Sequence, residues 1–158
     1  MNAAKMTPPP MYLLDTNIIS ELRKQDKANP GVQQFFDDAI AQEAKLFLSV
    51  ITIGELRRGV ELIRHRRDHP QADLLEAWLQ RILTDYADCI LDFTITDAQV
   101  WGYLRVPHPQ NAIDKQIAAT ALTHNLTLVT RNVQDFIGTG VDLLNPFQNP
   151  DAEISTNV

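Results

Sequence analysis

The sequence has few of the features that mark secreted or membrane proteins. Its 158 residues include a single cysteine, Cys89, so no internal disulfide can form and a disulfide-stapled secreted scaffold is excluded. The longest apolar run, residues 46–53, is interrupted by Ser49 and Thr52 and is far shorter than the roughly 20 residues that span a bilayer. Residues 1–10 carry one lysine and no apolar stretch, unlike a signal peptide. We therefore expect a cytoplasmic protein without a membrane-bound part.

Basic residues are also scarce. Fourteen Lys and Arg stand against twenty Asp and Glu, for a formal net charge of -6. A protein that holds nucleic acid over its whole surface usually has a basic balance, so this composition argues against that class. It leaves room for a local basic patch, and five arginines do crowd into residues 57–67.

The composition is that of one folded domain, since 44% of the residues are hydrophobic and 22% are charged. The proline-rich residues 1–10 and the polar residues 148–158 are predicted to be flexible tails around a domain at 11–147. Nearly continuous apolar runs are typical of strands buried on both faces of a parallel sheet. Such runs lie at 11–14, 46–50, 89–93 and 126–130, with a weaker one at 141–144.

Helix signals separate these strands. Asn29 and Pro30 form a typical helix start, and Thr52 with Glu55 has the form of a capping box. Apolar residues repeat at helical spacing over residues 74–86, and a further helix is predicted from Asp114 to about Asn125. Alternating strands and helices predict a single α/β domain with a mostly parallel central sheet and helices on both faces.

Several acidic residues fall where sites form in such sheets, at the carboxyl ends of the strands. Asp15 directly follows the first strand, Glu55 and Asp114 are placed in the first turns of two helices, and Asn132 and Asp135 follow the fourth strand. Each of them alone is explained equally well as a turn or cap residue. Together they would repel one another unless a hard cation such as Mg²⁺ or Mn²⁺ held them, so the arrangement indicates a metal site.

Four segments resemble the motifs of PIN-domain ribonucleases, specifically the VapC toxins of bacterial toxin–antitoxin pairs. They are residues 13–22 (LLDTNIISEL), 49–59 (SVITIGELRRG), 113–121 (IDKQIAATA) and 126–136 (LTLVTRNVQDF). The ending at residues 144–147 (LNPF) is similar to the FitB-like branch of that family. The likeness runs in order from about Tyr12 to Phe147, which covers the predicted domain.

The resemblance implies a PIN fold and a Mg²⁺- or Mn²⁺-dependent endoribonuclease that hydrolyses RNA, such as tRNA or rRNA, and inhibits translation. The residues it points to are Asp15, Glu55 and Asp114 as metal ligands, Asn132 or Asp135 as the fourth group, and Thr16 and Thr130 as hydroxyls that orient the acids or bound water. Some relatives have Asp where this chain has Asn132. RNA contacts are expected from Arg57, Arg58 and Arg131, unless the arginines simply form a solvated surface.

The resemblance further implies partners: a VapB-like antitoxin that binds operator DNA for the pair, and a second copy of the chain in a homodimer. Apolar residues of the early helices would either form the antitoxin groove or pack in the core, namely Ile18, Ile19, Leu22, Leu56 and Val60.

Two other functions stay open. A non-cleaving PIN domain that holds RNA or a partner is compatible with Asn132 in place of an acid. A phosphatase of the haloacid dehalogenase type would also have Asp after its first strand, but that family needs a second Asp two residues later, where this chain has Asn17. The intact Asp15, Glu55 and Asp114 favour the nuclease.

Overall fold

A computed structural model of the chain describes residues 7–147. Its five strands form one parallel sheet in the order β3-β2-β1-β4-β5. The strands are β1 (Met11–Leu14), β2 (Lys45–Ser49), β3 (Ile90–Leu91), β4 (Thr127–Val129) and β5 (Leu143–Leu144). All five predicted strands are present. β1 has the predicted bounds. β2 is displaced by one residue because Val50 already begins a helix, and the other three strands are shorter than predicted, β3 in part because Cys89 ends a 3-10 turn. The predicted C-terminal tail, residues 148–158, lies outside the described residues, and so do residues 1–6 of the predicted N-terminal tail.

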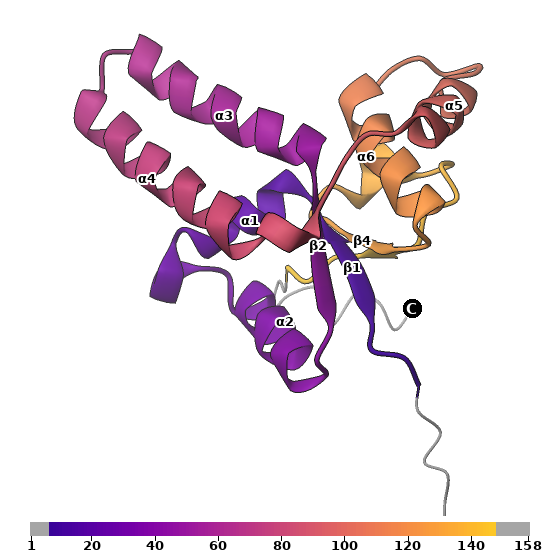
Figure 1. Cartoon of the computed structure of the whole chain (residues 1–158), viewed down its shortest axis with the longest axis horizontal. Coiled ribbons are helices and arrows are strands. Elements are labelled where there is room, and N and C mark those ends of the chain that lie inside the picture. Colours follow the sequence, from indigo (N-terminus) through magenta and orange to yellow (C-terminus); the bar gives the residue numbers. More distant parts are fainter. Residues whose placement is uncertain (1–6, 148–158) are drawn as a thin grey trace, which may run out of the picture.

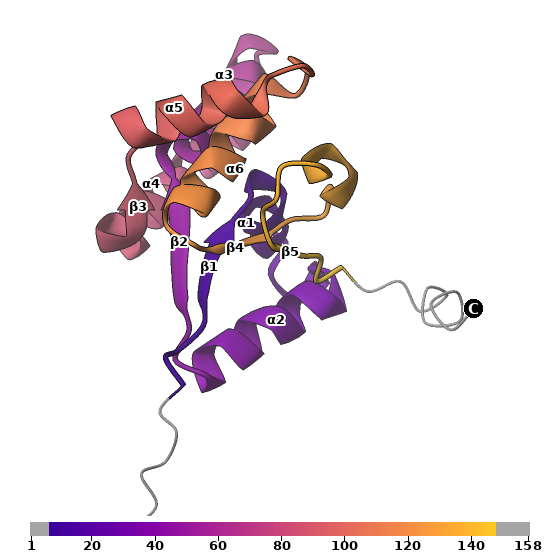
Figure 2. The ribbon, with the colours of Figure 1, turned by 90° about the vertical axis from the view of Figure 1, so that its right-hand side faces the viewer.

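Within residues 7–147, six α-helices connect and flank the strands. They are α1 (Thr16–Leu22), α2 (Pro30–Ala41), α3 (Val50–His65), α4 (His69–Asp85), α5 (Ile95–Leu104) and α6 (Ala112–Thr123), with 3-10 turns at Gln25–Lys27, Ala87–Cys89 and Val133–Phe136. α3 and α4 form a hairpin that extends beyond the end of β2 (Figure 1). α5 and α6 lie against each other (Figure 2). They are on the other side of the sheet from α3 and α4 (Figure 1). α5 was not among the predicted helices.

The local start signals were partly right. Asn29 caps α2, since its side-chain oxygen accepts from the backbone N–H groups of Gly31 and Val32. The capping box predicted at Thr52 and Glu55 is wrong: Ser49 caps α3 instead, and Thr52 is buried within the helix. Glu55 therefore lies in the second turn rather than the first. A capping box does form at the start of α5, between Thr94 and Asp97.

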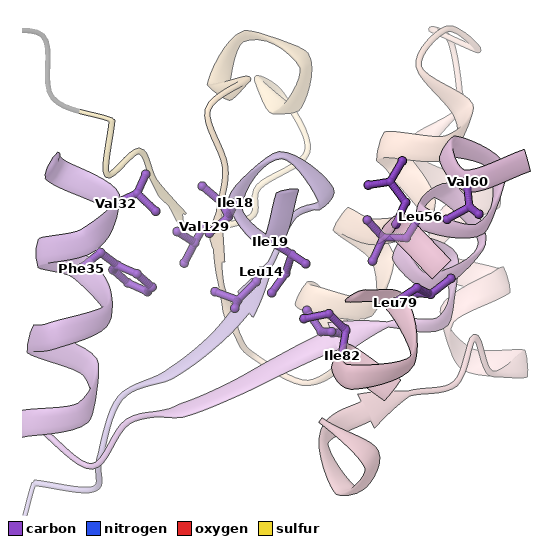
Figure 3. Close-up of a cluster of buried hydrophobic side chains, with 12 residues drawn as sticks. Leu14, Ile18, Ile19, Val32, Phe35, Leu56, Val60, Leu79, Ile82 and Val129 are labelled. Atoms are coloured by element: carbon purple, nitrogen blue, oxygen red, sulfur yellow. The ribbon is translucent and has the colours of Figure 1, made fainter. Parts of the chain in front are cut away.

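Adjacent residues of the central strands point to opposite faces of the sheet, as pleated strands require. Leu14 and Val129 belong to a core beneath α1 to α4, whose side chains are shown in Figure 3. Leu13 and Leu128 belong to a second core beneath α6. Helices thus cover both faces, which confirms the predicted α/β architecture. None of the helices within residues 7–147 has the length and apolar character needed to cross a membrane.

Candidate functional site

A hollow of about 260 Å³ opens at the carboxyl end of the sheet. It brings together three of the predicted acids from distant parts of the chain: Asp15 after β1, Glu55 in α3 and Asp114 in α6. Its other lining residues are Thr16, Asn17, Ile113, Ile117 and Asn132. Asp135 is not part of this lining, although its charge raises the pKa of both Asp15 and Asp114. Asp135 therefore acts on the hollow electrostatically from beside it.

Asp15 is the most buried of these acids, with 4% of its surface exposed. It forms the N-cap of α1, where its Oδ1 accepts the backbone N–H of Thr16 at 2.8 Å. Burial raises the pKa of Asp15, because a carboxylate loses hydration when it is enclosed. Hydrogen bonds from Thr130, Thr16 and Asn17 oppose that rise. The site thus holds a carboxylate that is buried and supplied with donors.

Thr130 and Asn17 form the hydrogen-bond network around Asp15. Oδ2 of Asp15 accepts the Thr130 hydroxyl at 2.8 Å and the Asn17 amide at 3.2 Å. Asn17 also accepts the backbone N–H of Arg131, and the Thr130 hydroxyl accepts that of Asn132. The ends of β1 and β4 are therefore tied together through side chains at the hollow.

The structure separates the two threonines that were predicted to orient the acids through their hydroxyls. Thr130 contacts Asp15 through its hydroxyl. Thr16 instead uses its backbone N–H, and its own buried hydroxyl has no hydrogen-bond partner within the described residues. Asn17 was not among the predicted site residues; its place two positions after Asp15, in the first turn of α1, is the signal that could have identified it.

Asp114 lies in the first turn of α6, where the helix dipole favours an ionised carboxylate. Its pKa is nevertheless raised to about 6, first by burial and then by the charges of Asp15, Asp135 and Glu55. Burial and the three neighbouring acids outweigh the helix terminus. The start of the helix therefore does not hold the pKa of Asp114 at its ordinary value.

The segment that carries Asp114 is held by contacts on both sides of it. The N-cap residue of α6, Asn111, has a left-handed backbone with φ of 58° and provides no side-chain cap. The Trp101 indole N–H donates to the carbonyl of Ala112 at 2.9 Å. The buried Lys115 donates its ammonium to the carbonyl of His108. These contacts from α5 and from the preceding loop fix the first turn of α6.

The acids suit a divalent cation that is only partly held by protein ligands. Within residues 7–147, no three His, Cys, Asp or Glu side chains lie close enough to hold an ion together. Mg²⁺ commonly uses one or two carboxylates and keeps several waters. Burial raises the pKa of Asp114 most, and the charges of Asp15, Asp135 and Glu55 add a repulsion that such a cation would relieve. The oxygen donors of the hollow therefore fit a hard divalent cation.

The three candidate RNA-binding arginines have different surroundings. Arg57 makes a two-pronged contact to Glu76, with distances of 2.7 and 2.8 Å, and also bonds Glu61. Arg131 lies over the ring of Phe147, 4.8 Å from its centroid. Arg58 is exposed and makes no ion pair within the described residues. None of the three lines the acidic hollow.

The fold and the hollow define an α/β protein with an acidic centre at the carboxyl edge of a parallel sheet. The PIN domain family matches residues 12–137, and the chain belongs to this family. Among curated proteins, Toxin FitB of Neisseria gonorrhoeae is 37% identical over 88% of this chain and 100% of its own length. The VapC ribonuclease Y4jK of Sinorhizobium fredii is 31% identical over 87% of this chain and 99% of its own length.

Solved structures agree with these relatives. The crystal structure of FitAcB from Neisseria gonorrhoeae includes a chain that is 34% identical, with a TM-score of 0.75 over 88% of this chain and 100% of that one. A structure of FitAB bound to a DNA fragment gives 33% identity and a TM-score of 0.73, over 88% and 97% of the two chains. The resemblance to the VapC-type and FitB-like PIN domains is confirmed.

Proposed function

We propose that this chain is the toxin of a type II toxin–antitoxin pair and acts as a Mg²⁺- or Mn²⁺-dependent endoribonuclease. The observation that carries the proposal is the convergence of Asp15, Glu55 and Asp114 on one hollow. Burial there, and then the charges of neighbouring acids, raise the pKa of Asp114 to about 6. An acidic centre of this kind is suited to bind a cation and, through it, a phosphodiester. The ribonuclease names of relatives such as Y4jK support RNA as the substrate.

The residues of the hollow have distinct roles in this proposal. Asp15 and Asp114 would hold the cation, and Glu55 would add a third negative charge to the hollow. Thr130 and Asn17 orient Asp15 and favour its ionised form through their hydrogen bonds. A divalent cation supplies Lewis acidity at such a site: it lowers the pKa of water and neutralises charge on the phosphate. Attack by water leaves a 5′-phosphate and a 3′-hydroxyl and needs no 2′-hydroxyl.

The fourth group of the site, after Asp15, Glu55 and Asp114, was predicted to be Asn132 or Asp135. Asn132 lines the hollow and can offer an amide oxygen, whereas Asp135 adds negative charge from beside it. We assign Asn132 to the metal or its water and Asp135 to a supporting electrostatic role.

The partners follow from the relatives. FitB is found with FitA, and the FitAB pair binds DNA, so we propose a VapB-like antitoxin, operator DNA bound through that antitoxin, and a homodimer of this chain. A groove of about 280 Å³ between α1, α3 and α4 includes Leu56, Val60 and Trp78, and suits an antitoxin segment. Ile18 and Ile19 are fully buried in the core and are not available for it, and Leu56 and Val60 are themselves core residues with only 7% and 3% of their surface exposed. We further propose that the protein acts in the cytoplasm and that its substrate is tRNA or rRNA.

The decisive experiment is cleavage of total RNA by the purified chain with Mg²⁺, Mn²⁺ or a chelator. We expect Asp15→Asn and Asp114→Asn to abolish the metal-dependent cuts while the circular dichroism spectrum is retained. Asp26→Asn, which removes an exposed acid from a 3-10 turn, is the matched control and should cut normally. Full activity in a folded Asp114→Asn protein would refute the assignment. RNA binding without cleavage by any cation would favour the non-cleaving alternative.

A further inference from the structure

We infer that an open hollow on α3, separate from the acidic one, binds the phosphate backbone of the RNA beside the cleaved bond. The hollow has a volume of about 450 Å³ and is lined by Arg58, Glu61, Leu62, Arg64 and His65. The inference rests on the proposed function, because it concerns the same RNA substrate. The lining of the acidic hollow includes no Lys or Arg, whereas the hollow on α3 is lined by Arg58 and Arg64.

The hollow lies along α3 directly beyond the acidic site. Arg58 is three residues after Glu55, and positions three or four apart share one face of a helix. Leu62 and His65 continue this spacing, so one side of α3 leads from Glu55 to His65 over about 15 Å. The first part of α3 contacts α6, which carries Asp114, and the helix then extends away from the sheet (Figure 1). A strand that leaves the acids along α3 meets this hollow.

The charges in the hollow are unevenly satisfied. Glu61 is paired with Arg64 and with Arg57, whose Nη1 lies 3.2 Å from its carboxylate. Arg57 is further tied to Glu76 on α4. Arg58 has no carboxylate partner within residues 7–147, and its side chain is exposed. The hollow therefore presents a guanidinium whose charge is not neutralised by the protein.

An unpaired arginine beside an acidic site matches the electrostatic need of RNA binding. Phosphates next to the scissile one are repelled by Asp15, Glu55 and Asp114, and the whole chain carries a net charge of -6. Arginine binds phosphate oxygens through a planar fork of N–H donors. Contacts of this kind position nucleic acid without reading its sequence. Arg58 is thus assigned to the RNA backbone, while its neighbour Arg57 joins α3 to α4.

The test measures the salt dependence of RNA binding. A fluorescein-labelled single-stranded 12-nucleotide RNA is titrated with the full chain in the Asp15→Asn background, with Mg²⁺ present, over a series of KCl concentrations. Each phosphate contact to a single strand contributes about -0.7 to the slope of log K against log salt. We expect Arg58→Gln to weaken binding several-fold and to make that slope shallower by about 0.7. Arg58→Lys should restore most of the slope, because it keeps the charge.

The control is Lys45→Gln, which removes an exposed cation at the amino end of β2, the opposite edge of the sheet; it should leave the slope unchanged. An Arg58→Gln protein with the affinity and slope of that control would overturn the inference. An unchanged slope together with a shift from dimer to monomer in size-exclusion chromatography would also overturn it, by assigning the hollow to subunit contact. Because binding is read without cleavage, failure of the nuclease assay remains a separate result.

Discussion

The hydroxyl of Thr130 donates a 2.8 Å hydrogen bond to Oδ2 of Asp15, joining residues 115 positions apart in the chain. The contact is possible because β1 and β4 are neighbours in the sheet, with Leu14 paired to Val129 in register. Asp15 directly follows β1 and Thr130 directly follows β4, so the two residues lie side by side. A parallel pairing of two apolar strands thus delivers a hydroxyl donor to a buried carboxylate.

Replacing Thr130 by valine should weaken metal binding. The change removes a donor that lowers the pKa of Asp15, and hydrogen bonds to charged groups contribute about 1.5–3 kcal/mol. We expect about tenfold weaker Mn²⁺ binding in isothermal titration calorimetry. The acidic limb of the pH–activity profile should move to higher pH, because Asp15 then ionises at higher pH. Thr123→Val, whose hydroxyl bonds the Ala119 carbonyl within α6, is the control; equal Mn²⁺ affinity in both variants would contradict the role.

Removing the charge of Asp114 should stabilise the metal-free protein at neutral pH. Its pKa is raised from 3.8 to about 6 on folding, so between these values the folded state binds more protons than the unfolded state. Stability from this group is therefore present at low pH and is lost as pH rises through that window. In EDTA at pH 7.5 or so, Asp114→Asn should melt above the unsubstituted protein, with a difference that narrows toward about pH 4. A constant difference across that range would contradict the raised pKa.

The indole of Trp101 is expected to position Asp114. Trp101→Phe keeps an aromatic ring between Phe93 and Arg105 but removes the N–H that bonds the Ala112 carbonyl. Small displacements of reacting groups are costly, so we expect kcat/KM to fall about tenfold and Mn²⁺ binding to weaken. Tyr103→Phe, which alters an exposed side chain of the same helix, should leave both unchanged. If Trp101→Phe lowers only the melting temperature, the contact is structural.

Exchanging the fourth polar group should distinguish Asn132 from Asp135. Asn132→Asp adds a carboxylate to the lining of the hollow, so Mn²⁺ should bind more tightly and the metal-free protein should melt at a lower temperature. Asp135→Asn removes a charge that raises the pKa of Asp15 and Asp114. It should shift the acidic limb of the pH–activity profile to lower pH and leave cleavage in place. Complete loss of cleavage in Asp135→Asn would make Asp135 the fourth ligand instead.

The strands and the edge at which the acids gather could be predicted from the sequence. Continuous apolar runs and a carboxylate directly after a strand, as in Leu14–Asp15, are local patterns. Because strands and helices alternate, the connections between parallel strands are almost always right-handed. The carboxyl ends of the strands then meet at one edge of the sheet. Glu55 lies at the predicted site even though α3 begins at Val50, before the predicted cap residue Thr52.

Other features were decided only by tertiary structure, because they depend on burial and on side chains distant in sequence. Arg57 and Arg58 are adjacent and chemically identical, yet Arg57 is bound to Glu76 on α4 and Arg58 is unpaired among residues 7–147. Asp114 stands at a helix start that favours ionisation, yet burial and three neighbouring carboxylates raise its pKa. The single cysteine and the net charge of -6 describe the whole chain, whereas electrostatic energy depends on the distance and solvation of particular groups.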